Sequence, residues 1–342
     1  MLRGDEPYPD MSLDRPALVV GGVEYNFKVL DPDLKTSVGW AHHGIAVLGD
    51  GSIVVAAPDN ASLLRLDPTG RERHRVGTEL VEMHGITALR SDSDVIWVAD
   101  NGEKAIPGRP SYGIFARRGR VVALGLDGIV RREIVVPQID AYATATWKPC
   151  AVAVDEEGLG GSGDVWVADG YGRSLIHRFS RDGRWLATVD GSESGTSFNT
   201  PHDLLVDRRR GFPEIYVADR SNARLVVLDV EGRFLRVVGE GVLSSPSGLA
   251  ISGLLLFVAE LRGRLAVLDA TDRLVGYLGT SDAPERPGWP NALNDRGETI
   301  RVPDLAASSF NSPHGIDTDR AGAVYVSEWL VGGRIVRLTP TD

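Results

Sequence analysis

The sequence lacks the features that mark several classes of protein. Its 342 residues include one cysteine, Cys150, so no internal disulfide can form and nothing requires an oxidising compartment. No apolar run approaches the roughly twenty residues that a membrane-spanning helix needs. The first residues, Met1 to Pro7, carry acidic side chains and no apolar stretch, unlike a secretory signal. We therefore expect a cytoplasmic protein with no membrane partner.

An excess of basic residues is also missing. The chain has 37 Lys and Arg against 47 Asp and Glu, which gives a formal net charge of −10. Nucleic acids and anionic membranes attract proteins that present a basic face, so no nucleic-acid partner is expected. The hydrophobic content of 42% and the charged content of 25% are ordinary values for a globular protein with a sizeable core.

What the sequence does contain is a repeat of about forty residues, a length typical of propeller blades. Its clearest copy runs from Pro201 to Gly239 and holds four short segments rich in β-branched and aromatic residues, bounded by Gly, Asp and Pro. Such segments are strand signals, and no long part of the chain has helical periodicity. Similar copies begin near residues 43, 84, 149, 246 and 313.

Six copies of four strands predict an all-β fold, a six-bladed β-propeller that occupies residues 1–342 as one domain. An irregular β-sandwich would not explain why Val-Ala-Asp recurs at one phase of the repeat. The last copy ends at Leu338 without an outer strand, and residues 1–39 form an N-terminal segment that precedes the first copy. We expect the strand from Tyr25 to Leu30 in that segment to complete the last blade, because closure removes an exposed sheet edge.

Two insertions interrupt the repeat, from Glu103 to Arg118 and from Thr280 to Ser309. Loops of this length inside a compact domain are often functional lids. Three tryptophans lie near predicted loops and are candidates for the wall of a substrate pocket: Trp147, Trp289 and Trp329. Three aromatic residues share one strand phase and are expected in the core between blades: Trp97, Trp166 and Tyr216.

Three histidines occupy one phase of the repeat, directly before the first strand of a unit. They are His84, His202 and His314, in the second, fourth and sixth copies. The first strands of a propeller line its channel, and alternate blades of six lie about 120° apart, so the three imidazoles should converge. Three histidines with an open fourth position are the ligands of a catalytic zinc site. The alternative is that each of them, considered singly, is an ordinary histidine in a turn.

The other histidines are less constrained. His43 stands at the same phase in the first copy and could act as an additional ligand, a partner of a ligand, or a substrate contact. His74 and His177 fall on outer strands, where we expect surface positions.

Two segments carry a resemblance to a known family. Val167-Ala168-Asp169-Gly170-Tyr171-Gly172-Arg173-Ser174 and Val217-Ala218-Asp219-Arg220-Ser221-Asn222-Ala223-Arg224 both follow a predicted second strand. With the repeat, they resemble NHL-type propellers, and among these the lyase domain of the peptidylglycine α-amidating enzymes. The resemblance implies a zinc ion held by the three channel histidines, with Tyr171 and Arg220 as catalytic residues.

The sequence departs from the family at several positions. An arginine of the family would be expected within Ala57 to Asn60, which has none. Gly315 stands where the family has an aspartate that helps to hold a structural calcium ion in the channel, although Ile86 still offers a carbonyl group. Ser312 replaces a methionine of the family. The resemblance therefore implies zinc more directly than it implies calcium.

The function that the resemblance implies is that of a zinc-dependent lyase. It would cleave a small-molecule or peptide-like carbinolamide to an amide and an aldehyde, with Tyr171 as general base and Arg220 lowering the pKa of the phenol. One alternative is a metal-dependent hydrolase, a lactonase or amidase, in which a metal-bound hydroxide attacks a carbonyl. Another is a non-catalytic NHL-type propeller that binds a protein or a carbohydrate. The sequence indicates no oligomeric state.

Overall fold

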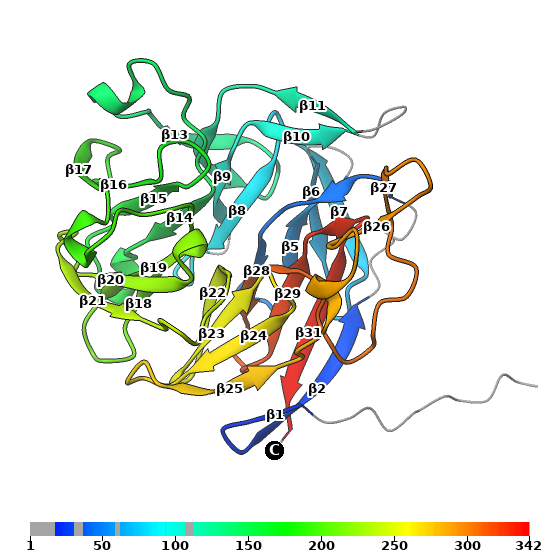
Figure 1. Cartoon of the computed structure of the whole chain (residues 1–342). Coiled ribbons are helices and arrows are strands. Elements are labelled where there is room, and N and C mark those ends of the chain that lie inside the picture. The colour runs from blue at the N-terminus through cyan, green and yellow to red at the C-terminus, as the bar shows by residue number, and fades with distance from the viewer. Residues whose placement is uncertain (1–17, 31–36, 59–61, 93, 107–111, 342) are drawn as a thin grey trace, which may run out of the picture.

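The strands of the chain form six sheets around a central axis (Figure 1). The computed structural model describes residues 18–30, 37–58, 62–92, 94–106 and 112–341. The segment from Met1 to Pro7, on which the prediction about a signal sequence rests, lies outside the described residues, as do Asp59 and Asn60. Each sheet is antiparallel, and the first strands of neighbouring blades contact one another around the channel. The six-bladed β-propeller is confirmed.

The strands follow the predicted repeat. Blade one consists of β4 (Ile45–Val47), β5 (Ile53–Ala56), β6 (Ser62–Leu66) and β7 (Glu72–Gly77). Blade two consists of β8 (Met83–Ala88), β9 (Val95–Asp100), β12 (Arg120–Gly125) and β13 (Val130–Ile134). Blade three consists of β14 (Ala151–Val154), β15 (Val165–Asp169), β16 (Leu175–Phe179) and β17 (Trp185–Val189). Blade four consists of β18 (Pro201–Asp207), β19 (Glu214–Asp219), β20 (Arg224–Leu228) and β21 (Phe234–Val238). Blade five consists of β22 (Pro246–Ser252), β23 (Leu255–Glu260), β24 (Arg264–Leu268) and β25 (Leu274–Leu278).

The sixth blade joins the two ends of the chain, as predicted. Its strands, from the channel outward, are β28 (Pro313–Thr318), β29 (Val324–Glu328), β31 (Arg334–Pro340), β2 (Val23–Leu30) and β1 (Leu18–Val20). The register pairs Tyr25 with Pro340 and Leu30 with Ile335. The N-terminal strand therefore closes the last blade, and β1 adds a fifth strand that the repeat did not indicate.

The core consists of six clusters, one between each pair of neighbouring blades, including the sixth and the first. Trp166 and Tyr216 are fully buried in these clusters, and Trp97 lies in the cluster between blades two and three, as expected. Trp147 is buried in the same cluster as Trp97, between blades two and three. Burial of β-branched and aromatic side chains between blades thus fixes how the first strands meet at the channel.

The two insertions and the blade connections carry short ribbons. The first insertion forms the hairpin of β10 (Glu103–Ile106) and β11 (Gly113–Ala116). The second contains a 3₁₀ turn over Ala283–Glu285 and the pair β26 (Ala292–Leu293) and β27 (Thr299–Ile300). A third ribbon pairs β3 (Trp40–Ala41) with β30 (Leu330–Val331). This last ribbon ties the entry of the first blade to the sixth blade.

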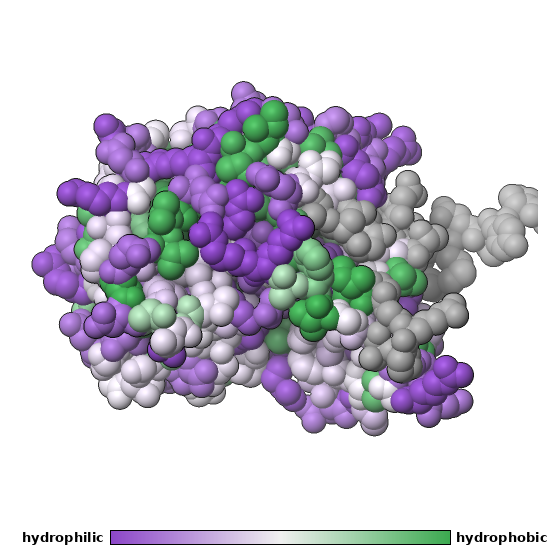
Figure 2. All heavy atoms as spheres, turned by 90° about the horizontal axis from the view of Figure 1, so that it is seen from above, coloured by the Kyte–Doolittle hydropathy of each residue, from purple (hydrophilic) through white to green (hydrophobic). Residues whose placement is uncertain are grey.

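The surface seen from above is mostly hydrophilic, with small and separate hydrophobic areas (Figure 2). Ile106, Ile114 and Phe115 of the hairpin β10–β11 are among the exposed large apolar side chains.

No helix in the described ranges has the length and apolar composition needed to cross a membrane.

One expectation about the histidines is wrong. His177 lies on β16 and is fully buried, with Nε2 2.8 Å from the Tyr142 hydroxyl and Nδ1 2.9 Å from Thr188 Oγ1. The long loop before β14 covers this part of the blade with Tyr142 and Trp147, which the repeat pattern does not reveal. His74 is exposed, as expected.

Burial of His177 predicts a pH dependence of stability. Burial lowers the pKa of its imidazole to about 3, below the value near 6.5 of an unfolded chain. The stabilising contribution is therefore complete above pH 6.5 and is lost as the pH falls toward 3, by about 1 kcal/mol per pH unit. Urea unfolding of His177→Gln should show a shallower loss of stability between pH 6.5 and 4 than the wild type. Parallel curves for the two proteins would show that His177 titrates normally when folded.

Candidate metal centre

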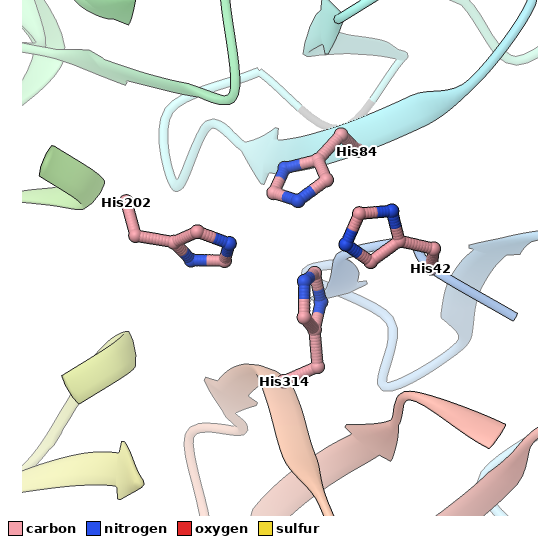
Figure 3. A group of neighbouring side chains, drawn as sticks. All are labelled: His42, His84, His202 and His314. Carbon is pink, nitrogen blue, oxygen red and sulfur yellow. The ribbon is translucent and has the colours of Figure 1, made fainter. Parts of the chain in front are cut away.

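The three histidines predicted at one phase converge at the mouth of the channel (Figure 3). His84 lies on β8, His202 on β18 and His314 on β28, and each side chain is 98% buried. The ring centroids are 4.8 Å apart for His84 and His202, 4.7 Å for His84 and His314, and 4.9 Å for His202 and His314. The structure thus brings together residues that are far apart in sequence.

The backbone of the next blade fixes the orientation of each ring. Nδ1 of His84 lies 2.7 Å from the carbonyl oxygen of Cys150, and Nδ1 of His202 lies 2.7 Å from that of Ser247. Nδ1 of His314 lies 3.3 Å from the carbonyl oxygen of His43. A carbonyl oxygen can only accept, so Nδ1 carries the proton and Nε2 presents a lone pair. Carbonyl partners of this kind orient metal-binding imidazoles.

Glycine after histidine allows this contact in two of the three blades. A Cβ atom on Gly85 would lie 2.6 Å from the Cys150 oxygen that His84 binds, and one on Gly315 would lie 2.8 Å from Gly44 Cα. Any side chain there would push neighbouring first strands apart. The His-Gly pair therefore combines a metal-binding side chain with a close approach of two blades.

The Nε2 atoms face a common point, and the described residues do not supply a hydrogen-bond donor for each of them. The hydroxyl of Tyr171 lies 3.1 Å from Nε2 of His84 and 2.8 Å from Nε2 of His202. Nε2 of His314 is buried and has no hydrogen-bond partner among the described residues. One hydroxyl proton can serve only one acceptor, so at least two buried lone pairs remain without a donor. Such orphaned acceptors are costly, and a cation that binds imidazole would satisfy them.

Burial also keeps the imidazoles in the form that binds metals. It lowers the pKa of His84 to about 3 and holds the pKa values of His202 and His314 well below the usual value. The three rings are therefore neutral near pH 7. Neutral imidazoles with free Nε2 atoms suit zinc, copper, iron and nickel alike. The residues present fit a transition metal.

A fourth histidine belongs to the cluster, and it is not the one singled out from the sequence. His42, His84, His202 and His314 each offer a ring nitrogen within 4.8 Å of the others, the only such group of three or more His, Cys, Asp or Glu residues in the described part of the chain. The ring of His43 lies elsewhere, with Nδ1 2.8 Å from its neighbour Gly44 O. The contribution of His43 is its carbonyl oxygen, which accepts from His314 Nδ1 and, at 3.0 Å, from Ser327 Oγ.

In blades two to six, an acidic residue at the end of the second strand holds the loop before the first strand. Asp100 accepts from the backbone N–H groups of Val81 and Glu82, just before His84, and Asp219 accepts from that of Asn199, just before His202. The same bonds occur in three further blades: Asp169 with Lys148, Glu260 with Ser244 and Ser245, and Glu328 with Asn311 and Ser312. The recurring Ala-Asp of the repeat is thus a loop anchor.

Among the described residues of the first blade, no carboxylate stands at this position. Its second strand, β5, ends at Ala56 and is followed by Ala57, and the pairing of β3 with β30 holds its entry loop instead. In this blade it is His42, one residue before the predicted phase, that belongs to the cluster.

Tyr171 and Arg220 meet beside the histidines, from neighbouring blades. Arg220 opens the 3₁₀ turn Arg220–Asn222, and its Nη1 donates to the Tyr171 hydroxyl at 3.4 Å. The guanidinium carbon lies 5.5 Å from the centre of the phenol ring. Burial raises the pKa of Tyr171 to about 12, and Arg220 opposes this rise only in part. Arg220 thus acts on this pKa in the expected direction, but burial outweighs it in the chain by itself.

A cavity of about 390 Å³ opens beside the cluster. Trp40, Trp329, Ala105 and Ile114 form its apolar walls, and the two indole rings stack at 5.4 Å. The polar residues that line it are His42, Tyr171, Glu82, Asn101, Glu103 and Lys148. Trp329 therefore lies where a pocket wall was expected, whereas Trp289 does not line this cavity.

The hairpin β10–β11 forms one side of this cavity and is held by two ion pairs. Lys104 Nζ lies 2.7 Å from Glu82 Oε2 with both side chains buried, and Lys148 Nζ lies 2.6 Å from Glu103 Oε1 at the surface. Glu82 Oε1 has no hydrogen-bond partner among the described residues. The first insertion thus contributes one side of the cavity through Glu103, Ala105 and Ile114.

The channel below the histidines offers little to a calcium ion. Asp203, which follows His202, lines a small void there, and its two oxygens already accept from Leu204 N at 2.8 Å and Leu249 N at 2.7 Å. Gly315 contributes no carboxylate. Calcium therefore stays a prediction that rests on the resemblance alone.

Comparison with known proteins gives the same family resemblance. No family model matches the chain. It is 25% identical over 260 residues to a peptidyl-α-hydroxyglycine α-amidating lyase of Caenorhabditis elegans, a match that spans 75% of this chain and 63% of the worm protein. It is 27% identical over 188 residues to the peptidylglycine α-amidating monooxygenases of rat and mouse, over 53% of this chain and 17% of theirs. The chain thus covers less than two thirds of each of these relatives.

Solved structures share the fold at lower identity. A streptogramin B lyase matches 93% of the chain and 98% of its own length, with a TM-score of 0.57 and 15% identity. The virginiamycin B lyase of Staphylococcus aureus, with quinupristin, matches 92% of the chain and 99% of its own length, with a TM-score of 0.54 and 11% identity. These likenesses concern the fold alone. In fold and in sequence together, the chain is a six-bladed β-propeller that resembles the peptidyl-α-hydroxyglycine α-amidating lyases.

Proposed function

We propose that this chain is a metal-dependent lyase that cleaves a carbinolamide into an amide and an aldehyde. The observation that carries the proposal is the convergence of three buried, neutral imidazoles whose Nδ1 atoms are fixed by backbone carbonyls. His84, His202 and His314 would hold the metal through Nε2, and zinc is the proposed ion because it favours such a set with one position left open. The sequence similarity to an amidating lyase supports the reaction class.

The roles of the residues follow from their positions. Zinc, when bound, supplies a Lewis acid that stabilises negative charge on a substrate oxygen. Tyr171 places its oxygen within 3.2 Å of three of the ring nitrogens, where that oxygen can take the proton of the substrate hydroxyl. Arg220 donates to the same oxygen and favours its anionic form.

The proposed reaction balances without water or a redox partner. The proton of the hydroxyl moves to Tyr171 Oη, the carbon–oxygen double bond forms, and the carbon–nitrogen bond breaks. Tyr171 then returns the proton to the departing amide nitrogen. The apolar walls of Trp40, Trp329 and Ile114 suit a substrate with an apolar or planar acyl group and keep water away from the reacting atoms.

The test is product formation from a defined substrate. N-benzoyl-α-hydroxyglycine should yield equal amounts of benzamide and glyoxylate with zinc-loaded protein, well above the rate with protein treated with a chelator. Hydrolysis would instead release benzoate, because water would attack the acyl carbon. Benzoate as the product would favour the hydrolase, and the absence of both bound metal and turnover would favour a binding propeller.

A further inference from the structure

His42 differs from the other three histidines in how the chain holds it. Its ring centroid lies 4.7 Å from those of His84 and His314, so it is as close to the cluster as the others (Figure 3). In the described part of the chain, its side chain has one hydrogen bond, between Nε2 and the Tyr171 hydroxyl at 3.2 Å. Among the described residues, no backbone carbonyl accepts from its Nδ1, in contrast to the other three rings. His42 therefore points into the cluster without the support that locks its neighbours.

The chain around His42 is also less constrained. His42 follows the two-residue strand β3, which pairs only with the two-residue strand β30, whereas the other histidines lie on first strands of full sheets. Its ring is partly exposed, lies 5.2 Å from the ring of Trp329 and lines the cavity. Of the four imidazoles, it is the one that lines this cavity.

We propose that His42 is a fourth and exchangeable ligand of the metal, bound in the resting protein and displaced by the substrate. The proposal rests on the metal site proposed above. Zinc takes four ligands, and catalytic sites keep the fourth position for water or substrate. A histidine on a short ribbon at the cavity wall fills that position when no substrate is present. Three ligands would be oriented by backbone carbonyls, and the fourth would be exchangeable. Substrate would then reach the metal only on the side of the cavity.

X-ray absorption of the zinc-loaded wild-type protein tests this directly. We expect four imidazole nitrogens around zinc in the resting protein, and three nitrogens and one sulfur after addition of thioglycolate, because thiolates bind zinc well. Three imidazoles in the resting state would overturn the proposal, as would four that persist beside the sulfur.

A variant gives the second test in the cobalt-substituted protein. His42→Ala should retain cobalt, change its visible spectrum, and bind azide at least about tenfold more tightly, equivalent to 1.4 kcal/mol. His74→Ala, which changes an exposed histidine, should match the wild type. An unchanged spectrum and azide affinity in His42→Ala would show that His42 is no ligand, and complete loss of cobalt would show that it is a permanent one.

These measurements are independent of turnover. Four imidazoles around zinc with no release of glyoxylate would refute the proposed reaction and leave His42 as a ligand. Release of glyoxylate by a protein with three imidazoles around zinc, both at rest and with thioglycolate, would support the reaction and refute His42 as a ligand. A wild-type protein that binds no metal would refute both.

Discussion

Replacement of His202 by alanine is expected to remove the metal and abolish turnover while the propeller stays folded. His202 supplies one of the three Nε2 atoms, and its ring contacts both His84 and His314. Loss of one of the three locked ligands leaves two of them and the exchangeable His42, so the ion should be released. The Lewis acid contributes several kcal/mol to the transition state, so turnover should fall by about 10³-fold or more.

The measurement is metal content by mass spectrometry together with the rate of glyoxylate release. The matched control is His74→Ala, because His74 is exposed on an outer strand and far from the channel. Circular dichroism and thermal unfolding would show that the loss is not caused by misfolding. A His202→Ala protein that keeps both metal and activity would contradict the proposed ligand set.

Replacement of Tyr171 by phenylalanine is expected to keep the metal and to lower kcat by about 10²- to 10⁴-fold, the usual contribution of a proton-transfer group. The phenol oxygen is the atom that meets His84, His202 and Arg220, whereas the ring packs in the core between blades three and four. Removal of the hydroxyl therefore takes away the proton acceptor and leaves the packing in place.

Steady-state kinetics and metal content measure this effect. Tyr277→Phe is the matched control, because it removes a partly buried hydroxyl that donates to Val242 O, away from the histidines. A Tyr171→Phe enzyme with the kcat of the wild type would exclude the phenol from proton transfer. A variant that lost its metal would indicate that Tyr171 supports the ion rather than the chemistry.

The fold could be predicted from the sequence because each blade repeats the same physical solution. The carboxylate at the end of the second strand holds the loop before the first strand, so Ala-Asp recurs wherever that bond is made. Residues at the same position of the repeat occupy the same place in each blade. His84, His202 and His314 could therefore be placed on one face from the sequence alone.

The same reasoning failed where a blade departs from the repeat. In the first blade Ala57 stands where the other blades have the carboxylate, and the phase points to His43 although His42 is the residue in the cluster. The buried pair of Glu82 and Lys104 was also missed, because Lys104 lies in an insertion that has no counterpart in the other blades. His177 was misplaced because residues of a connecting loop cover it.

Electrostatics could not be predicted from pairs of residues. The sequence placed Arg220 near Tyr171 correctly, yet burial of the phenol outweighs that single cation and raises its pKa. The net effect depends on the whole environment of the hydroxyl, including any cation at the histidines.

The central claim is that the channel histidines hold a catalytic metal, and anomalous X-ray diffraction from crystals of the purified protein tests it most directly. The account predicts one strong anomalous peak about 2.0–2.1 Å from Nε2 of His84, His202 and His314. Well-ordered histidines with no anomalous peak between them, in crystals grown with zinc, would contradict it.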